Sequence, residues 1–154
     1  MTYKIKGGFN SGLHIYKEEE KIMYSLVKKE FFKNEIEIYN NNHKSLLTVK
    51  KSISGFNIEN IDLKKLDKLV NIENNSIIFN LGEIIHFKKK WYDISLYPCS
   101  IIYFNNKKIG QIKPKRRIFS FNINLNLYIY DDFKDLTDYI LIFILCKYSN
   151  QDHG

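Results

Sequence analysis

The sequence predicts a mainly β protein, an all-β shell that wraps one buried helix near the C-terminus. The first observation is the alternation from Phe119 to Ile129, where apolar residues fill every odd position. This period of two is typical of a strand with one face in the core and one in solvent. The second is the run from Tyr139 to Cys146, which is apolar on every side. Such a helix must be surrounded by protein or lipid, and about 12 Å of helix cannot cross a hydrocarbon layer of about 30 Å.

Length and composition fit a single folded domain. The chain has 154 residues, of which 44% are hydrophobic and 27% charged. These values predict one domain over residues 1–154 and exclude disorder of the whole chain. The first nine residues contain no apolar segment of a signal peptide, and no run is long enough for a transmembrane helix. We therefore expect a soluble or peripheral protein.

Short apolar runs between polar turns predict the strands of the first half. Glycines separate the first two runs, and Asn40, Asn41 and Asn42 supply a later turn because asparagine tolerates positive φ. The expected strands are Tyr3–Lys6, Leu13–Tyr16, Ile22–Lys28, Ile36–Tyr39 and Leu46–Ser52.

A change of periodicity follows these strands. Between Asn60 and Val70 the apolar residues fall at Ile61, Leu63, Leu66, Leu69 and Val70, with lysine and aspartate between them. This spacing predicts a short amphipathic helix over residues 60–70.

The second half returns to strands. Pro98 and Pro114 end two of them, and Asn105-Asn106 predicts a tight turn between two others. The expected strands are Ser76–Leu81, Glu83–Lys88, Trp91–Tyr97, Ser100–Phe104, Lys108–Lys113 and Phe119–Ile129.

The last segment is predicted to be a helix from Leu136 to Tyr148. Acidic residues precede and open it, where they suit the positive end of a helix dipole, and Lys147 suits the other end. A buried strand is the rival assignment, given the isoleucines of this run. The acidic residues are Asp131, Asp132, Asp135 and Asp138, and calcium binding is a second interpretation of them.

The charge of the chain points to a polyanion. The net charge is +7, with 22 lysines and only two arginines. A basic protein is attracted to nucleic acid, to an anionic membrane surface or to an acidic partner. Proteins that recognise nucleic acid bases favour arginine. A lysine-rich surface is better suited to a diffuse electrostatic attraction than to specific base contacts. Lysines that only keep an isoleucine-rich core soluble are the plain alternative.

Two basic clusters are the candidate ligand-binding residues. The first places three lysines beside two aromatic residues, as at a membrane interface, and its alternative is a solvated turn with Trp91 in the core. The second contains both arginines and could hold a phosphate or headgroup, or serve as a charged hairpin tip that keeps an edge soluble. Candidate residues are Lys88, Lys89, Lys90 and Trp91 from the first cluster, and Lys113, Lys115, Arg116 and Arg117, preceded by Lys107 and Lys108, from the second.

Catalytic and metal-binding signatures are not found. The sequence contains no nucleophile elbow, no phosphate-binding glycine loop and no metal-binding histidine pair. Cys99 and Cys146 lack the spacing of a redox or zinc motif, which suggests reduced thiols in an intracellular protein. We therefore expect no enzyme activity, no metal and no cofactor.

Several segments resemble the tubby C-terminal-like superfamily, which includes LURP-one-related proteins and phospholipid scramblases. The matching residues are Ile101–Lys113, Phe119–Ile129 and Asp131–Tyr148, above all the stretch from Asp135 to Cys146. The resemblance implies a closed antiparallel β-barrel threaded by a hydrophobic C-terminal helix, in a small microbial, bacterial member. For tubby proteins it implies phosphoinositide binding through basic residues on the barrel. The chain lacks the full aspartate-rich pattern and the proline-rich and cysteine-rich regions of scramblases.

Together these observations predict a non-catalytic binding module. Its basic hairpins would engage anionic lipid headgroups or a membrane surface, in the cytoplasm and peripherally at the inner membrane face. The alternative is an intracellular immunity or regulatory protein that masks an acidic partner protein. Nucleic acid binding is a third and less favoured class.

Overall fold

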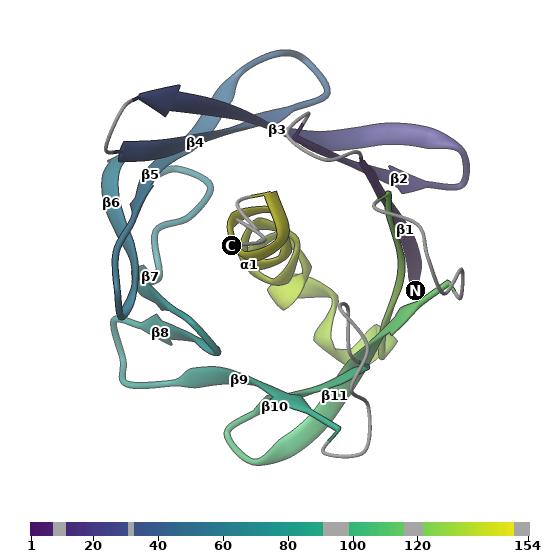
Figure 1. Cartoon of the computed structure of the whole chain (residues 1–154). Coiled ribbons are helices and arrows are strands. Elements are labelled where there is room, and N and C mark those ends of the chain that lie inside the picture. Colours follow the sequence, from purple (N-terminus) through teal and green to yellow (C-terminus); the bar gives the residue numbers. More distant parts are fainter. Residues whose placement is uncertain (8–11, 31–32, 91–98, 116–121, 150–154) are drawn as a thin grey trace.

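Twelve strands and one C-terminal helical segment form the structure, a computed structural model that describes residues 1–7, 12–30, 33–90, 99–115 and 122–149 (Figure 1). The strands are β1 (Thr2–Gly7), β2 (Leu13–Lys17), β3 (Glu20–Glu30), β4 (Lys33–Asn40), β5 (Ser45–Lys51), β6 (Gly55–Ile61), β7 (Leu69–Glu73), β8 (Ser76–Phe79), β9 (Ile84–Lys89), β10 (Ser100–Phe104), β11 (Lys107–Pro114) and β12 (Ile123–Ile129). The 3₁₀ helix η1 (Asp131–Leu136) leads into the α-helix α1 (Thr137–Ser149).

The strands close into an antiparallel barrel. Each strand pairs with its neighbours in sequence, and β1 pairs with β12 to complete the ring. Asn105 and Asn106 both have positive φ, as a tight turn between β10 and β11 requires, and they lie where the sequence predicts this turn. The predicted closed antiparallel barrel is confirmed.

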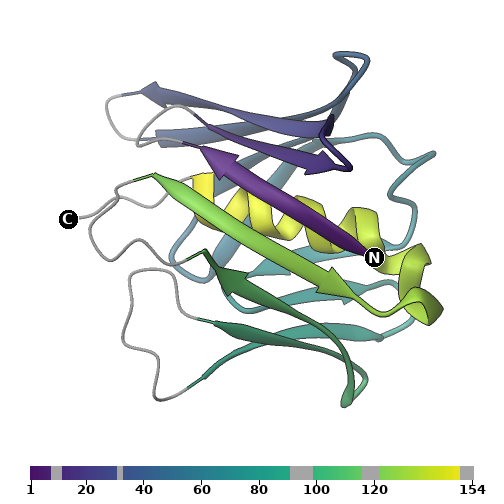
Figure 2. The same ribbon diagram turned by 90° about the vertical axis from the view of Figure 1, so that its right-hand side faces the viewer.

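The helix α1 runs through the barrel (Figures 1 and 2). Ten of its residues are buried, and they lie on all sides of the helix. Phe143 stacks on Phe87 of β9 with ring centroids 3.7 Å apart, and Tyr139 packs edge-on against Phe79 of β8 at 4.9 Å. A helix without a polar face is stable here because the strands surround it. The predicted buried helix is confirmed, and the rival strand assignment is wrong.

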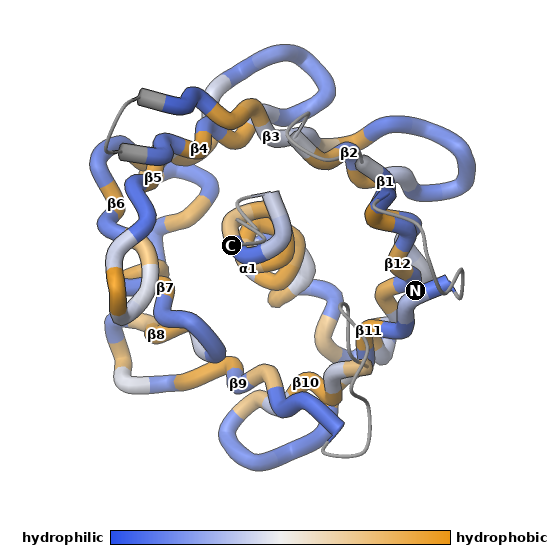
Figure 3. Tube along the Cα trace, viewed as in Figure 1, coloured by the Kyte–Doolittle hydropathy of each residue, from blue (hydrophilic) through white to orange (hydrophobic). Residues whose placement is uncertain are grey.

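Hydrophobic and hydrophilic residues alternate along strands of the barrel wall, as the colours of the trace in Figure 3 show. In β12 the buried residues are Ile123, Leu125, Leu127 and Ile129, and the residues between them are partly exposed. This confirms the alternation predicted for residues 123–129. Phe119 and Phe121, like the predicted strand Trp91–Tyr97, lie outside the described residues.

The predicted helix over residues 60–70 is wrong. Ile61 ends β6 in register with Leu47 of β5, and Leu69 begins β7 in register with Phe79. Between β6 and β7 the chain makes a single helical turn, in which the Asp62 carbonyl accepts a hydrogen bond from the N–H of Leu66. Leu66 alone of the connecting segment's apolar side chains enters the core, while Leu63 points to solvent. Strand pairing therefore prevails over the helical spacing.

The barrel has two distinct ends. The α1 segment begins at one end, where the Tyr139 hydroxyl donates to Asp67 Oδ1 at 3.3 Å. It finishes at the other, where Lys147 Nζ donates to the turn between β7 and β8. We call these the helix-start end and the helix-exit end. Strand directions place the last residues of β1, β9 and β11 at the helix-exit end.

Candidate functional site

Half of the barrel wall contains lysines and no carboxylates. The six neighbouring strands β9, β10, β11, β12, β1 and β2 carry no aspartate or glutamate within their bounds. We call these six strands the acid-free wall. Its lysines are Lys4, Lys6, Lys17, Lys88, Lys89, Lys107, Lys108 and Lys113.

The other half of the wall is balanced. Strands β3 to β8 carry six lysines and six glutamates. Some of these charges pair across strands, since Lys28 Nζ lies 2.7 Å from Glu37 Oε1 and Lys50 Nζ lies 2.6 Å from Glu59 Oε1. The net charge of the strands therefore lies entirely on the acid-free wall.

The structure places the described residues of both predicted clusters at the helix-exit end. Lys88 and Lys89 end β9, and the N–H of Lys90 donates to the Cys99 carbonyl just before β10. Lys113 lies near the end of β11, and the N–H of Lys115 donates to the Asn124 carbonyl of β12. Only β10 separates the two groups, so the fold brings them together.

Other predicted residues are not part of this group. Trp91, Arg116 and Arg117 lie outside the described residues. Lys107 and Lys108 begin β11 at the helix-start end, so the second sequence cluster is divided between the two ends of one strand.

Lysines of β1 join this surface, and sequence reasoning missed them. Lys4 and Lys113 are both in register with Asn126 of β12, from opposite sides. Lys6 lies one step further toward the helix-exit end. The alternation of these lysines with Tyr3 and Ile5 could have indicated an outward face, but the pairing of β1 with β12 could not be read from it.

Aromatic rings, more than carboxylates, neighbour these lysines. Lys6 Nζ lies 5.4 Å from the ring centroid of Tyr16, and Lys113 Nζ lies 5.8 Å from that of Tyr128. Such contacts stabilise an ammonium group without cancelling its charge. Lys4 differs, because its Nζ lies 2.7 Å from Glu19 Oε1 in the turn after β2, and this hydrogen bond lowers the pKa of Glu19.

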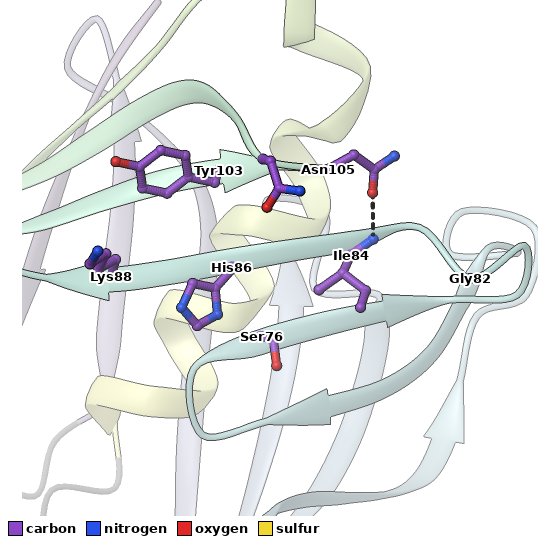
Figure 4. Close-up of a pocket in the computed structure, with 8 residues that line it drawn as sticks. Ser76, Gly82, Ile84, His86, Lys88, Tyr103 and Asn105 are labelled. Carbon is purple, nitrogen blue, oxygen red and sulfur yellow. Dashed lines mark hydrogen bonds between the residues drawn. The ribbon is translucent and has the colours of Figure 1, made fainter.

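A hollow of about 720 Å³ lies on the outer face of the wall (Figure 4). His86 of β9 is in register with Ser76 of β8 on one side and with Tyr103 of β10 on the other. These side chains and the Lys88 ammonium can all donate hydrogen bonds to an anion. The residues that line the hollow are Ser76, Gly82, Ile84, His86, Lys88, Tyr103, Asn105 and Asn106.

A partly buried lysine lies at the helix-exit end. Lys147 Nζ donates to the Asn74 carbonyl at 2.5 Å and to Asn75 Oδ1 at 2.8 Å. Burial, together with the nearby ammonium of Lys89, lowers the pKa of Lys147 to about 8. The rim of the barrel therefore brings two ammonium groups close together.

The Lys147→Met variant tests this arrangement. Between pH 8 and the ordinary lysine pKa of 10.5, the unfolded chain holds the Lys147 proton more tightly than the folded chain. The free energy of unfolding of the wild type should therefore rise relative to that of the variant as pH increases from 7 to 9.5. Urea unfolding of both proteins at the two pH values measures this difference. If the free energy of unfolding of the wild type minus that of the variant stays constant or falls between pH 7 and 9.5, the folded protein does not penalise the Lys147 charge.

The acidic residues before α1 show no arrangement of metal ligands. Among the described residues, no three histidine, cysteine, aspartate or glutamate side chains are placed to hold a metal ion. No side chain caps the first residue of η1, and Asp131 Oδ1 instead accepts a hydrogen bond from the N-terminal ammonium group of Met1 at 3.0 Å. Neither Cys99 nor Cys146 forms a disulfide within the described residues, and burial in α1 raises the pKa of the Cys146 thiol.

No described helix is long and apolar enough to cross a bilayer. Comparison of the chain with family models, with curated proteins and with solved structures finds no match. The candidate site therefore depends on geometry and charge alone.

Proposed function

We propose that the protein is a non-catalytic binding module that engages an anionic membrane surface through the acid-free wall. The observation that carries this proposal is the charge asymmetry of the barrel. Eight lysines and no carboxylates lie on one half of the strands, and equal numbers of both lie on the other. A chain that used lysines only for solubility would have no reason to separate them in this way.

The chemistry of the wall favours a diffuse anionic surface. Each lysine near an anionic bilayer contributes about 1 kcal/mol to binding, so several lysines on one face give substantial affinity. Tyr16, Tyr103 and Tyr128 lie between these lysines, and tyrosine favours the headgroup level of a membrane. The described part of the wall contains no arginine, the residue that suits planar bidentate recognition best.

The closure of the barrel restricts how a partner can bind. Strand addition needs an unpaired edge, and each strand of the acid-free wall is paired with a neighbour on both sides. A partner of this wall therefore contacts outward side chains.

The proposed location is the cytoplasm, with peripheral attachment at the inner membrane face. The barrel around α1 is consistent with a tubby-like assignment.

Vesicle co-sedimentation tests this function. The protein should bind phosphatidylcholine vesicles that contain 30% phosphatidylserine and ignore vesicles of phosphatidylcholine alone. Binding should weaken strongly between about 0.05 and 0.3 M NaCl, because salt shortens the range of the interaction to a few ångströms. Equal binding to both vesicles at low salt would refute the proposal. Binding to a soluble acidic polypeptide but not to anionic vesicles would favour an acidic protein partner instead.

A further inference from the structure

We propose that the barrel docks side-on, with the outer face of β8 and β9 against the bilayer and with Leu81 and Ile84 in the headgroup region. This inference rests on the proposed membrane binding and specifies which part of the wall makes contact. It assigns the turn between β8 and β9 as an anchor and the lysines of β9 as its electrostatic partners.

The first argument is the exposure of apolar side chains in this turn. Leu81 is 80% exposed at the tip, and Ile84, the first residue of β9, is 43% exposed because the next residue, Ile85, points into the core. A Cβ atom added at Gly82 would meet no atom within 4 Å. The tip therefore stands clear of the rest of the barrel and can reach a flat surface.

The second argument is the order of side chains along β9. Ile84, His86 and Lys88 follow one another on the same outer face, as Figure 4 shows. Four residues of strand separate the apolar and cationic positions, about 13 Å at the usual rise. A surface with apolar and cationic groups in one plane is typical of proteins that lie in a membrane interface.

The third argument is charge complementarity. β9 is the first strand of the acid-free wall, so the anchor adjoins the surface that attracts an anionic bilayer. Glu83 is the one carboxylate in this turn, against Lys88, Lys89 and Lys90 on the same strand and its flank. The neighbouring hollow, with His86 and Tyr103, gives lipid headgroups a place to bind between apolar Ile84 and cationic Lys88.

Exposed apolar residues elsewhere provide a matched control. Leu26 on β3 is 44% exposed, and β3 lies six strands from β9 in either direction around the ring. Ile53, in the turn between β5 and β6, is fully exposed at the helix-exit end. The pair Leu26→Ser and Ile53→Ser therefore removes at least as much exposed apolar surface as Leu81→Ser and Ile84→Ser, from other faces of the barrel.

The experiment measures the partition of both double variants into vesicles with 30% phosphatidylserine. Leu81→Ser/Ile84→Ser should bind at least about tenfold more weakly than the wild type, because even partial removal of two aliphatic side chains from water contributes more than about 1.4 kcal/mol. The control pair should bind like the wild type. Equal effects of the two pairs, or none, would overturn side-on docking while leaving charge-driven binding intact.

A label gives a second readout that does not depend on affinity. In a Cys99→Ser background, an environment-sensitive fluorophore on Leu81→Cys should shift to the blue when vesicles are added, and one on Ile53→Cys should not. A blue shift only for the label at position 53 would show that the barrel docks with the turn between β5 and β6 at the bilayer, and would overturn the proposed orientation. A wild-type protein that binds no vesicles would refute the proposed function itself. A dimer that Leu81→Ser/Ile84→Ser splits, with vesicle binding unchanged, would assign this face to a second copy of the chain.

Discussion

Replacing Phe143 by alanine is expected to lower the free energy of unfolding by about 3–5 kcal/mol. Phe143 lies in the middle of α1 with 1% of its surface exposed, and its ring is stacked on Phe87 at an interplanar angle of 6°. The closed ring of strands around it cannot collapse easily onto the space that the phenyl group leaves. Urea unfolding at neutral pH measures the loss.

Two further variants make this prediction sharp. Tyr130→Ala removes an aromatic residue that is about half exposed before η1, so we expect a change of less than about 1 kcal/mol. Phe143→Leu keeps most of the volume and should cost less than the alanine change, so it remains informative if Phe143→Ala does not fold. A loss below about 1 kcal/mol for Phe143→Ala would contradict a helix packed inside the barrel.

The sequence predicts the elements whose patterns are compatible with few environments. Strand β12 alternates with a period of two, and α1 has no polar face, so each pattern is compatible with few environments. Asn105-Asn106 predicts its turn because asparagine tolerates positive φ at both positions. The barrel with a buried helix follows from these local patterns together with the resemblance to tubby-like proteins.

Other features depend on contacts that a single sequence does not contain. The segment from Asn60 to Val70 has helical spacing, but its ends join β6 and β7, and the pairing partners of these strands are distant in the chain. Lys4 and Lys6 join Lys113 only because β1 pairs with β12 across the seam of the barrel. The order of strands around the ring therefore determines which lysines lie together in the candidate site, and composition alone does not.

Removing four lysines from the acid-free wall is expected to weaken binding to anionic vesicles about 100- to 1,000-fold at low salt. The estimate takes about 1 kcal/mol for each lysine near the bilayer and about 1.4 kcal/mol for each tenfold change. The four substitutions are Lys88→Gln, Lys107→Gln, Lys108→Gln and Lys113→Gln, on β9 and β11. All four side chains are exposed, so the free energy of unfolding should change little.

A matched variant keeps the net charge equal. The substitutions Lys29→Gln, Lys51→Gln, Lys64→Gln and Lys65→Gln remove four exposed lysines from strands β3 and β5 and from the segment between β6 and β7. Both variants carry four fewer positive charges than the wild type, so a difference between them reports position and not total charge.

The affinity of these two variants for vesicles with 30% phosphatidylserine, measured side by side at about 0.1 M salt, tests the central claim most directly. If the acid-free wall is the binding surface, the wall variant should lose nearly all binding and the matched variant should keep affinity within about tenfold of the wild type. Equal losses in the two variants would show that total charge drives binding, and a larger loss in the matched variant would show that the binding surface lies on the other half of the barrel.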